Sequence, residues 1–145
     1  MYTHILIATD GSELANKAVS TGTALAKALN SKVTIVTVTE PWHSVVTGEA
    51  ALGFPPKEYE TSAADSAHRV LTGASEIADK GGVAYAVVHV KDQHPADGIL
   101  DAAKRAGCDL IVMASHGRRG LTRLLLGSQA VKVLTHSGVP VLICR

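Results

Sequence analysis

The segment from Met113 to Ser128 combines residue types that could hold an anion. It follows the apolar run Leu110–Met113, which is typical of a buried strand, and it ends at Gly127-Ser128, where a helical pattern begins. Backbone N–H groups at the start of a helix favour a bound anion, and glycine lets the backbone approach it closely. Three glycines and three arginines lie in this segment, so it predicts a phosphate-binding loop.

A second polar loop, Ala8-Thr-Asp-Gly-Ser12, follows the apolar run Ile5–Ala8. In open α/β sheets, ligands bind beyond the carboxyl ends of the strands, at the point where the strand order reverses. If the two strands are neighbours at that point, both loops face one crevice. The periodicity of the sequence does not give the strand order.

The elements that must position these loops alternate along the chain. Strands are predicted over 5–8, 33–38, 83–90, 110–113 and 139–144, and helices over 13–29, 58–80, 95–106 and 128–136. This alternation predicts one α/β domain over 1–145, with a parallel sheet covered by helices on both faces. Pro140 lacks an N–H donor and favours an edge or the start of its strand. Residues 40–57 are predicted to be irregular, a length typical of binding loops and lids.

The composition excludes several classes of protein. The 14 basic and 13 acidic residues give a net charge of +1, which offers no electrostatic footprint for nucleic acid and no polybasic membrane anchor. No apolar run approaches the roughly 20 residues of a membrane span. The N-terminus is typical of a strand rather than a signal peptide. Cys108 and Cys144 are predicted to be buried free thiols, so we expect a cytoplasmic protein in a reducing compartment.

The spacing of the first segment is similar to a family signature. Ala114, two residues, Gly117, nine residues and Gly127-Ser128 resemble G-x2-G-x9-G-[ST], with alanine in place of the first glycine. This is the signature of the ATP-binding branch of the universal stress protein family. The opening strand that runs into Thr9-Asp-Gly-Ser12, together with 109–113 and 139–143, extends the resemblance over essentially the whole chain.

The resemblance implies a fold, a ligand and a partner. The family fold is a five-stranded parallel sheet of order 3-2-1-4-5, which is Rossmann-like and places the first and fourth strands at the switch point. The implied ligand is ATP, or else ADP or AMP, with magnesium or manganese only as its counter-ion. The implied partners are a second copy, paired through the strand 139–144, and an unnamed downstream protein.

The resemblance also assigns residues to the nucleotide. Asp10 and Val38 resemble the residues that flank adenine and ribose, and Ala8 and Thr9 belong to the same wall. The remaining positions resemble the ribose and phosphate binders or, for the arginine, a contact of the terminal phosphates. They are Met113, Ala114, Gly117, Arg118, Gly127, Ser128 and Gln129.

Each of these residues has a structural alternative. Asp10-x-x-Glu13 resembles a capping box, Val38 fits a core position, and the glycines could shape turns or start a helix. Arg118, Arg119 and Arg123 could be a solvated surface cluster. At Ala114 a positive φ would cost about 1–2 kcal/mol, whereas a negative φ would cost little.

Three functions remain open at this stage. The first is an ATP-binding regulatory protein of the stress response. The second is a slow ATPase or nucleotidyl transferase, and the third is a nucleotide-free interaction module. There is no G-x4-G-K-[ST] motif, so fast hydrolysis is not predicted. His116 has no sequence partner for catalysis, and no metal-ligand motif is present, so no catalytic or metal-binding residue is assigned.

Overall fold

The computed structural model describes residues 1–117 and 125–145. Its strands are β1 His4–Ala8, β2 Lys32–Val38, β3 Tyr85–Val90, β4 Leu110–Ala114 and β5 Val141–Cys144. Its helices are α1 Glu13–Leu29, α2 Trp42–Val45, α3 Ala50–Gly53, α4 Pro56–Gly81, α5 Pro95–Ala106 and α6 Ser128–His136.

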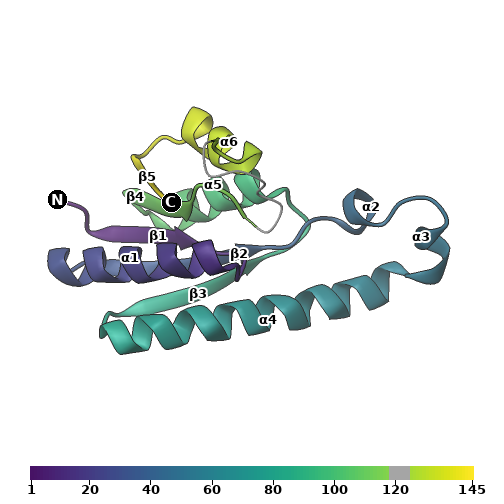
Figure 1. Cartoon of the computed structure of the whole chain (residues 1–145), viewed down its shortest axis with the longest axis horizontal. Coiled ribbons are helices and arrows are strands. Elements are labelled where there is room, and N and C mark those ends of the chain that lie inside the picture. Colours follow the sequence, from purple (N-terminus) through teal and green to yellow (C-terminus); the bar gives the residue numbers. More distant parts are fainter. Residues whose placement is uncertain (118–124) are drawn as a thin grey trace.

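The five strands form one parallel sheet in the order β3-β2-β1-β4-β5 (Figure 1). This confirms the predicted α/β class and the order 3-2-1-4-5. The central strands β1 and β4 pair in register from Ile5 with Leu110 to Ile7 with Val112. Chain connections leave this pair in opposite directions across the sheet, so the switch point lies between β1 and β4.

Two apolar layers hold the helices on the sheet. One layer packs α1 and α4 against one face and includes Ile7, Val19 and Leu71. The other packs α5 and α6 against the opposite face and includes Leu6, Ile99 and Val133. Because both faces are covered, β1 and β4 read as continuous apolar runs rather than as alternating ones.

Several predicted element boundaries were wrong. Residues 40–57 are not wholly irregular, because α2 and α3 each form one helical turn there. The strand β3 begins at Tyr85 rather than at residue 83. The strand β5 begins at Val141 rather than at residue 139, since the Ser137 hydroxyl engages both backbone groups of Val139.

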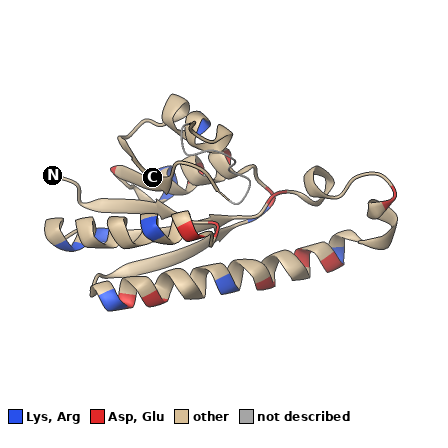
Figure 2. Cartoon of the chain, viewed as in Figure 1, with Lys and Arg blue, Asp and Glu red and all other residues tan. Residues whose placement is uncertain are grey.

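The helix α4 is much longer than the strand it covers. Its 26 residues extend about 39 Å at the usual helical rise, whereas the six residues of β3 extend about 20 Å. The N-terminal part of α4, together with α2 and α3, therefore projects beyond the sheet (Figure 1). Acidic and basic side chains are interspersed along α4, as Figure 2 shows.

The described residues contain no helix that is both long enough and apolar enough to cross a membrane. Cys108 and Cys144 are free thiols, and Cys108 is buried as predicted, whereas the prediction was wrong for Cys144, which is only partly buried. Burial raises the pKa of the Cys108 thiol to about 11.

Candidate functional site

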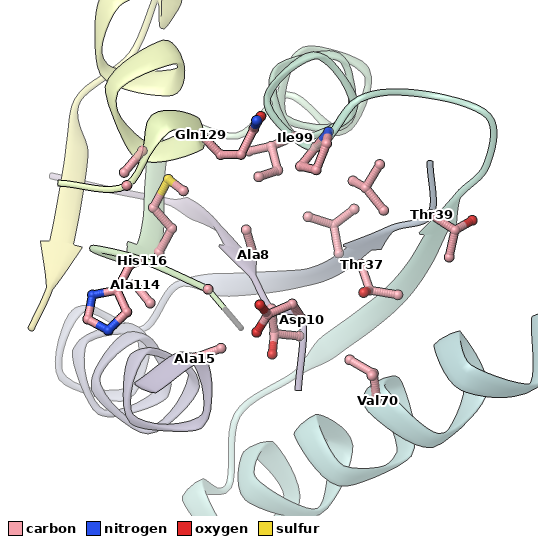
Figure 3. A pocket seen from close by; sticks show the side chains of 18 of the residues that line it. Ala8, Asp10, Ala15, Thr37, Thr39, Val70, Ile99, Ala114, His116 and Gln129 are labelled. Carbon is pink, nitrogen blue, oxygen red and sulfur yellow. The ribbon is translucent and has the colours of Figure 1, made fainter. Parts of the chain in front are cut away.

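A pocket of about 450 Å³ lies at the carboxyl ends of the central strands (Figure 3). The loops after β1 and β4 both contribute to its wall, as expected for two neighbouring strands at a switch point. Ten of the eleven predicted binding residues line it: Ala8, Thr9, Asp10, Val38, Met113, Ala114, Gly117, Gly127, Ser128 and Gln129. The eleventh, Arg118, lies outside the described residues, as do Arg119, Gly120 and Arg123.

The loop after β1 directs a carboxylate into this pocket. Gly11 has a φ of 79°, a left-handed conformation that glycine adopts without strain. Ser12 then caps α1 by accepting a hydrogen bond from the Ala15 N–H at 3.3 Å. The Asp10 carboxylate accepts from the Ser12 N–H at 2.9 Å instead. The capping-box interpretation of Asp10 was therefore wrong, because Ser12 holds the cap and Asp10 lines the pocket.

Gly117 and Gly127 lie at close contacts between the loops rather than in left-handed turns. Neither has a positive φ. A Cβ on Gly117 would overlap the Asp10 carboxylate, so the two loops touch at this point. A Cβ on Gly127 would lie 3.1 Å from the Ser115 carbonyl oxygen and 3.2 Å from the Cα of His116. The Gly127 N–H donates to that same carbonyl at 2.7 Å.

Ala114 fits its position without strain. It is the last residue of β4, pairs with Cys144 of β5, and does not have a positive φ. Alanine here carries no left-handed penalty, so the departure from the first glycine of the signature leaves the backbone conformation unaffected.

The base of the pocket on the α5 side is apolar. Val38 packs against α5, where a Cβ on Gly98 would meet both of its methyl groups at 2.8 Å. Ile99 and Pro95 of α5 complete this wall with Met113 of β4. Val38 is thus both a packing residue and a pocket residue, so the two interpretations of the sequence do not exclude each other.

The N-terminus of α6 opens on the other side of the pocket. Gly127 occupies the N-cap position and makes no side-chain cap bond, and Ser128 begins the helix. The first-turn N–H groups of a helix have no partner within the helix and carry a partial positive charge. This end of the pocket therefore favours an anionic group.

The rim on the β2 side is held by side chains that the sequence analysis did not single out. The Thr39 hydroxyl and His89 Nε2 are 2.8 Å apart. The Tyr59 hydroxyl donates to the Glu40 carbonyl at 2.6 Å, and the Glu40 carboxylate lies 3.8 Å from His94 Nδ1. Burial, followed by Lys91, lowers the pKa of His89. Burial also raises the pKa of Tyr59, which keeps its hydroxyl protonated as a donor.

The other pocket residues missed at the sequence level come from several elements. Thr37 and Thr39 flank Val38, the last residue of β2, Ser66 and Val70 belong to α4, and His116 follows β4. The position of the threonines at a strand end could have indicated them. His116 Nδ1 lies 3.2 Å from the Ser115 hydroxyl, which belongs to a residue that is 4% exposed.

Within residues 1–117 and 125–145, no group of three or more His, Cys, Asp or Glu side chains is placed to hold a metal ion. The same residues define an open α/β domain with a pocket at its switch point, one end of which favours an anionic group. Its apolar side lies next to a carboxylate and a helix N-terminus. This is the class of Rossmann-like α/β domains.

Comparison with known proteins identifies the family within this class. The family model described as "Universal stress protein family" matches residues 1–145, so this chain belongs to the universal stress protein family. Universal stress protein YxiE of Bacillus subtilis is 33% identical over 151 residues, covering 100% of both chains.

Solved structures share the fold. Hypothetical protein MJ0577 is 26% identical with a TM-score of 0.80, covering 99% of this chain and 96% of its own. A universal stress protein in complex with cAMP is 24% identical with a TM-score of 0.71, covering 99% and 97%. The Archaeoglobus fulgidus protein in complex with dAMP is 20% identical with a TM-score of 0.72, covering 99% and 98%.

Proposed function

We propose that this chain is a regulatory protein that binds ATP, or the related ADP or AMP, in the pocket between the loops after β1 and β4. The observation that carries the proposal is the close packing of these loops around Gly117 and Gly127 at the N-terminus of α6. Family members of this fold were solved with cAMP and with dAMP, so the fold can accommodate an adenine nucleotide.

The end of β2 provides a seat for the base. Peptide groups alternate in direction along a strand, so those of Val38 point the same way as those of Val36. The Val36 carbonyl accepts from the Thr9 N–H at 2.9 Å, so the peptide groups of both Val36 and Val38 point towards the side of the sheet edge where β1 lies. The pairing register of β1 ends at Ala8 with Val36. The Val38 peptide thus faces the space beyond β1, where it would offer one donor and one acceptor to an adenine edge.

The other parts of the nucleotide follow from the charges. The Asp10 carboxylate would accept hydrogen bonds from ribose hydroxyls. The N–H groups at the start of α6, next to Gly127 and Ser128, would hold the phosphates. Magnesium or manganese would enter as the counter-ion of the phosphates. Arg118 remains a predicted phosphate contact.

The test is direct identification of a bound nucleotide. The protein is purified natively, denatured, and its released small molecules are identified by chromatography and mass spectrometry. In parallel, ATP with magnesium at 100 times its Kd should raise the free energy of unfolding by about 2.7 kcal/mol. Asp10→Ala should reduce this stabilisation, whereas Asp65→Ala on the exposed surface of α4 should leave it intact. The absence of both co-purified nucleotide and any shift at millimolar ATP would refute the proposal.

We further propose that the chain forms a homodimer through the free edge of β5. Leu142 on β5 is 37% exposed, and Val131 and Leu134 on α6 are 46% and 41% exposed. An exposed apolar edge strand is a template for pairing with another chain. Light scattering at micromolar concentration should give a dimer mass that Leu142→Lys reduces to that of a monomer. A monomer mass for the unaltered chain would contradict this proposal.

The regulatory part of the proposal is supported by the position of the segment that follows the pocket wall. Glu40 lines the pocket, and the next residues lead directly into the projecting segment with α2 and α3. Occupancy of the pocket would therefore alter the presentation of this segment to a downstream protein. The alternative of a slow ATPase or nucleotidyl transferase predicts turnover that survives purification and that Asp10→Ala abolishes.

A further inference from the structure

The helix α5 begins without a cap of its own. His94 at the N-cap position makes no side-chain hydrogen bond to the helix. Pro95 has no N–H, so Ala96 carries the first N–H donor of the helix. Ala96 is 2% exposed, which makes an unpaired N–H there unfavourable.

A residue from another helix satisfies this donor. The Gln129 Oε1 accepts from the Ala96 N–H at 3.0 Å, across a separation of 33 residues in the chain. An N–H can only donate, so the oxygen of the carboxamide must face Ala96. Figure 3 shows the side chain reaching from α6 towards α5. Gln129 was predicted to bind the ligand. In the structure its side-chain oxygen instead binds the backbone of α5.

The positions of the two partners give this bond its significance. Gln129 directly follows Ser128, which lies in the anion-favouring wall, and Ala96 directly follows Pro95, which lies in the apolar wall. One hydrogen bond thus connects the two walls of the pocket at adjacent residues. The helices α5 and α6 also share an apolar cluster, which includes Ala103 and Val133. This packing helps to hold the two walls of the pocket together.

We propose that Gln129 is a positioning residue. It would set the distance between the base seat, which is the Val38 peptide at the end of β2, and the phosphate seat, which is the group of N–H donors at the start of α6. The proposal rests on the nucleotide-binding function above. A ligand that occupies both seats gains from their fixed distance, because binding at one seat raises the effective concentration of the other part at its own seat. Adenosine or tripolyphosphate, which fills one seat only, gains nothing from it.

The experiment compares three ligands on the full chain. Titration measures the Kd of ATP, adenosine and inorganic tripolyphosphate for the unaltered protein and for Gln129→Met, which keeps the chain length but removes the acceptor. Because this hydrogen bond is made within the protein, its net contribution is the upper bound on the effect, so ATP affinity should fall by about three- to tenfold. The affinities for adenosine and tripolyphosphate should each change by less than about threefold, within the scatter of one weakly coupled contact.

A second variant separates positioning from simple capping. His94 has the extended conformation of an N-cap residue, with φ −68° and ψ 147°, so His94→Ser should give α5 a cap of its own. In the double variant with Gln129→Met, the melting temperature should recover while the loss of ATP affinity persists. His94→Ser alone, which also removes the contact between His94 and Glu40 at the pocket rim, gives the reference ATP affinity against which the double variant is compared.

The outcomes distinguish the two proposals. Equal weakening of all three ligands, or recovery of ATP affinity in the double variant, would show that Gln129 is only a cap and would overturn the inference. An unaltered protein that binds none of the three ligands would refute the nucleotide-binding function itself.

Discussion

Replacement of Gly127 by alanine tests whether the pocket depends on close contact between β4 and α6. The added Cβ would lie 3.1 Å from the Ser115 oxygen and 3.2 Å and 3.3 Å from the Cα and Cβ of His116. These atoms have little room to move, because Ser115 is held on both sides. The Ser115 N–H donates to the Cys144 carbonyl at 2.8 Å, and the Ser115 carbonyl accepts from the Gly127 N–H at 2.7 Å. We expect the start of α6 to shift away from the loop.

The size of the effect follows from two opposing contributions. Overpacking of this kind costs about 1–3 kcal/mol. Alanine suits the φ of −63° and ψ of 155° at this residue, so a smaller unfolded-state entropy offsets about 0.4–1 kcal/mol. The net loss of about 1–2 kcal/mol corresponds to a melting temperature lower by roughly 2–8 °C. Displacement of the N–H groups at the start of α6 should also weaken ATP binding about tenfold.

The matched control lies just beyond the other end of the same helix. A Cβ on Gly138 would meet no atom within 4 Å, and this glycine has no positive φ, so Gly138→Ala should be neutral or slightly stabilising. Urea unfolding and thermal denaturation, each with and without ATP, measure both effects. If Gly127→Ala and Gly138→Ala have equal stability and equal ATP response, the close-contact explanation is incorrect.

Three further predictions concern other parts of the molecule. Gly73→Ala in α4, where a Cβ meets no atom within 4 Å, should raise the free energy of unfolding by about 0.5–1 kcal/mol, and unchanged urea midpoints would contradict this. Hydrogen bonds, chiefly from the Thr3 N–H, lower the pKa of Asp109; Asp109→Asn should therefore destabilise the protein at neutral pH, with a difference that shrinks as pH falls through the lowered folded pKa. Burial raises the pKa of Cys108 to about 11, so iodoacetamide at about pH 8 should label it only after unfolding, as peptide mass spectrometry would show.

The sequence predicted those parts of the fold that local patterns determine. The apolar runs at Ile5–Ala8 and Leu110–Met113 indicated strands because both faces of the sheet are covered. The strand order depends on contacts between distant residues, so only the family resemblance could supply it. The prediction of an irregular segment over 40–57 missed α2 and α3, since helices of one turn have no periodic signal.

The candidate site was predictable where it follows the strand ends. Asp10 lies two residues after β1 and Gly127 lies at the start of α6, and the structure brings both to one pocket. The interpretation of Asp10 as the N-cap of α1 was wrong. The left-handed turn at Gly11 places Ser12, rather than Asp10, at the N-cap position. Ser66 and Val70 could not be predicted, since nothing in a helical pattern shows which residues reach a pocket formed by other elements.

The length of α4 has a consequence for how the molecule opens. Its buried residues, Ala67, Leu71, Ala74 and Ala78, all lie in the part of the helix that covers the sheet. No residue of α4 before Ala67 is buried, so the amide hydrogens of these turns should exchange with solvent by local fraying, whereas those after Leu71 should exchange only when the sheet itself opens. A single continuous helix would thus contain two regimes of hydrogen exchange, and the boundary between them would lie beside the pocket.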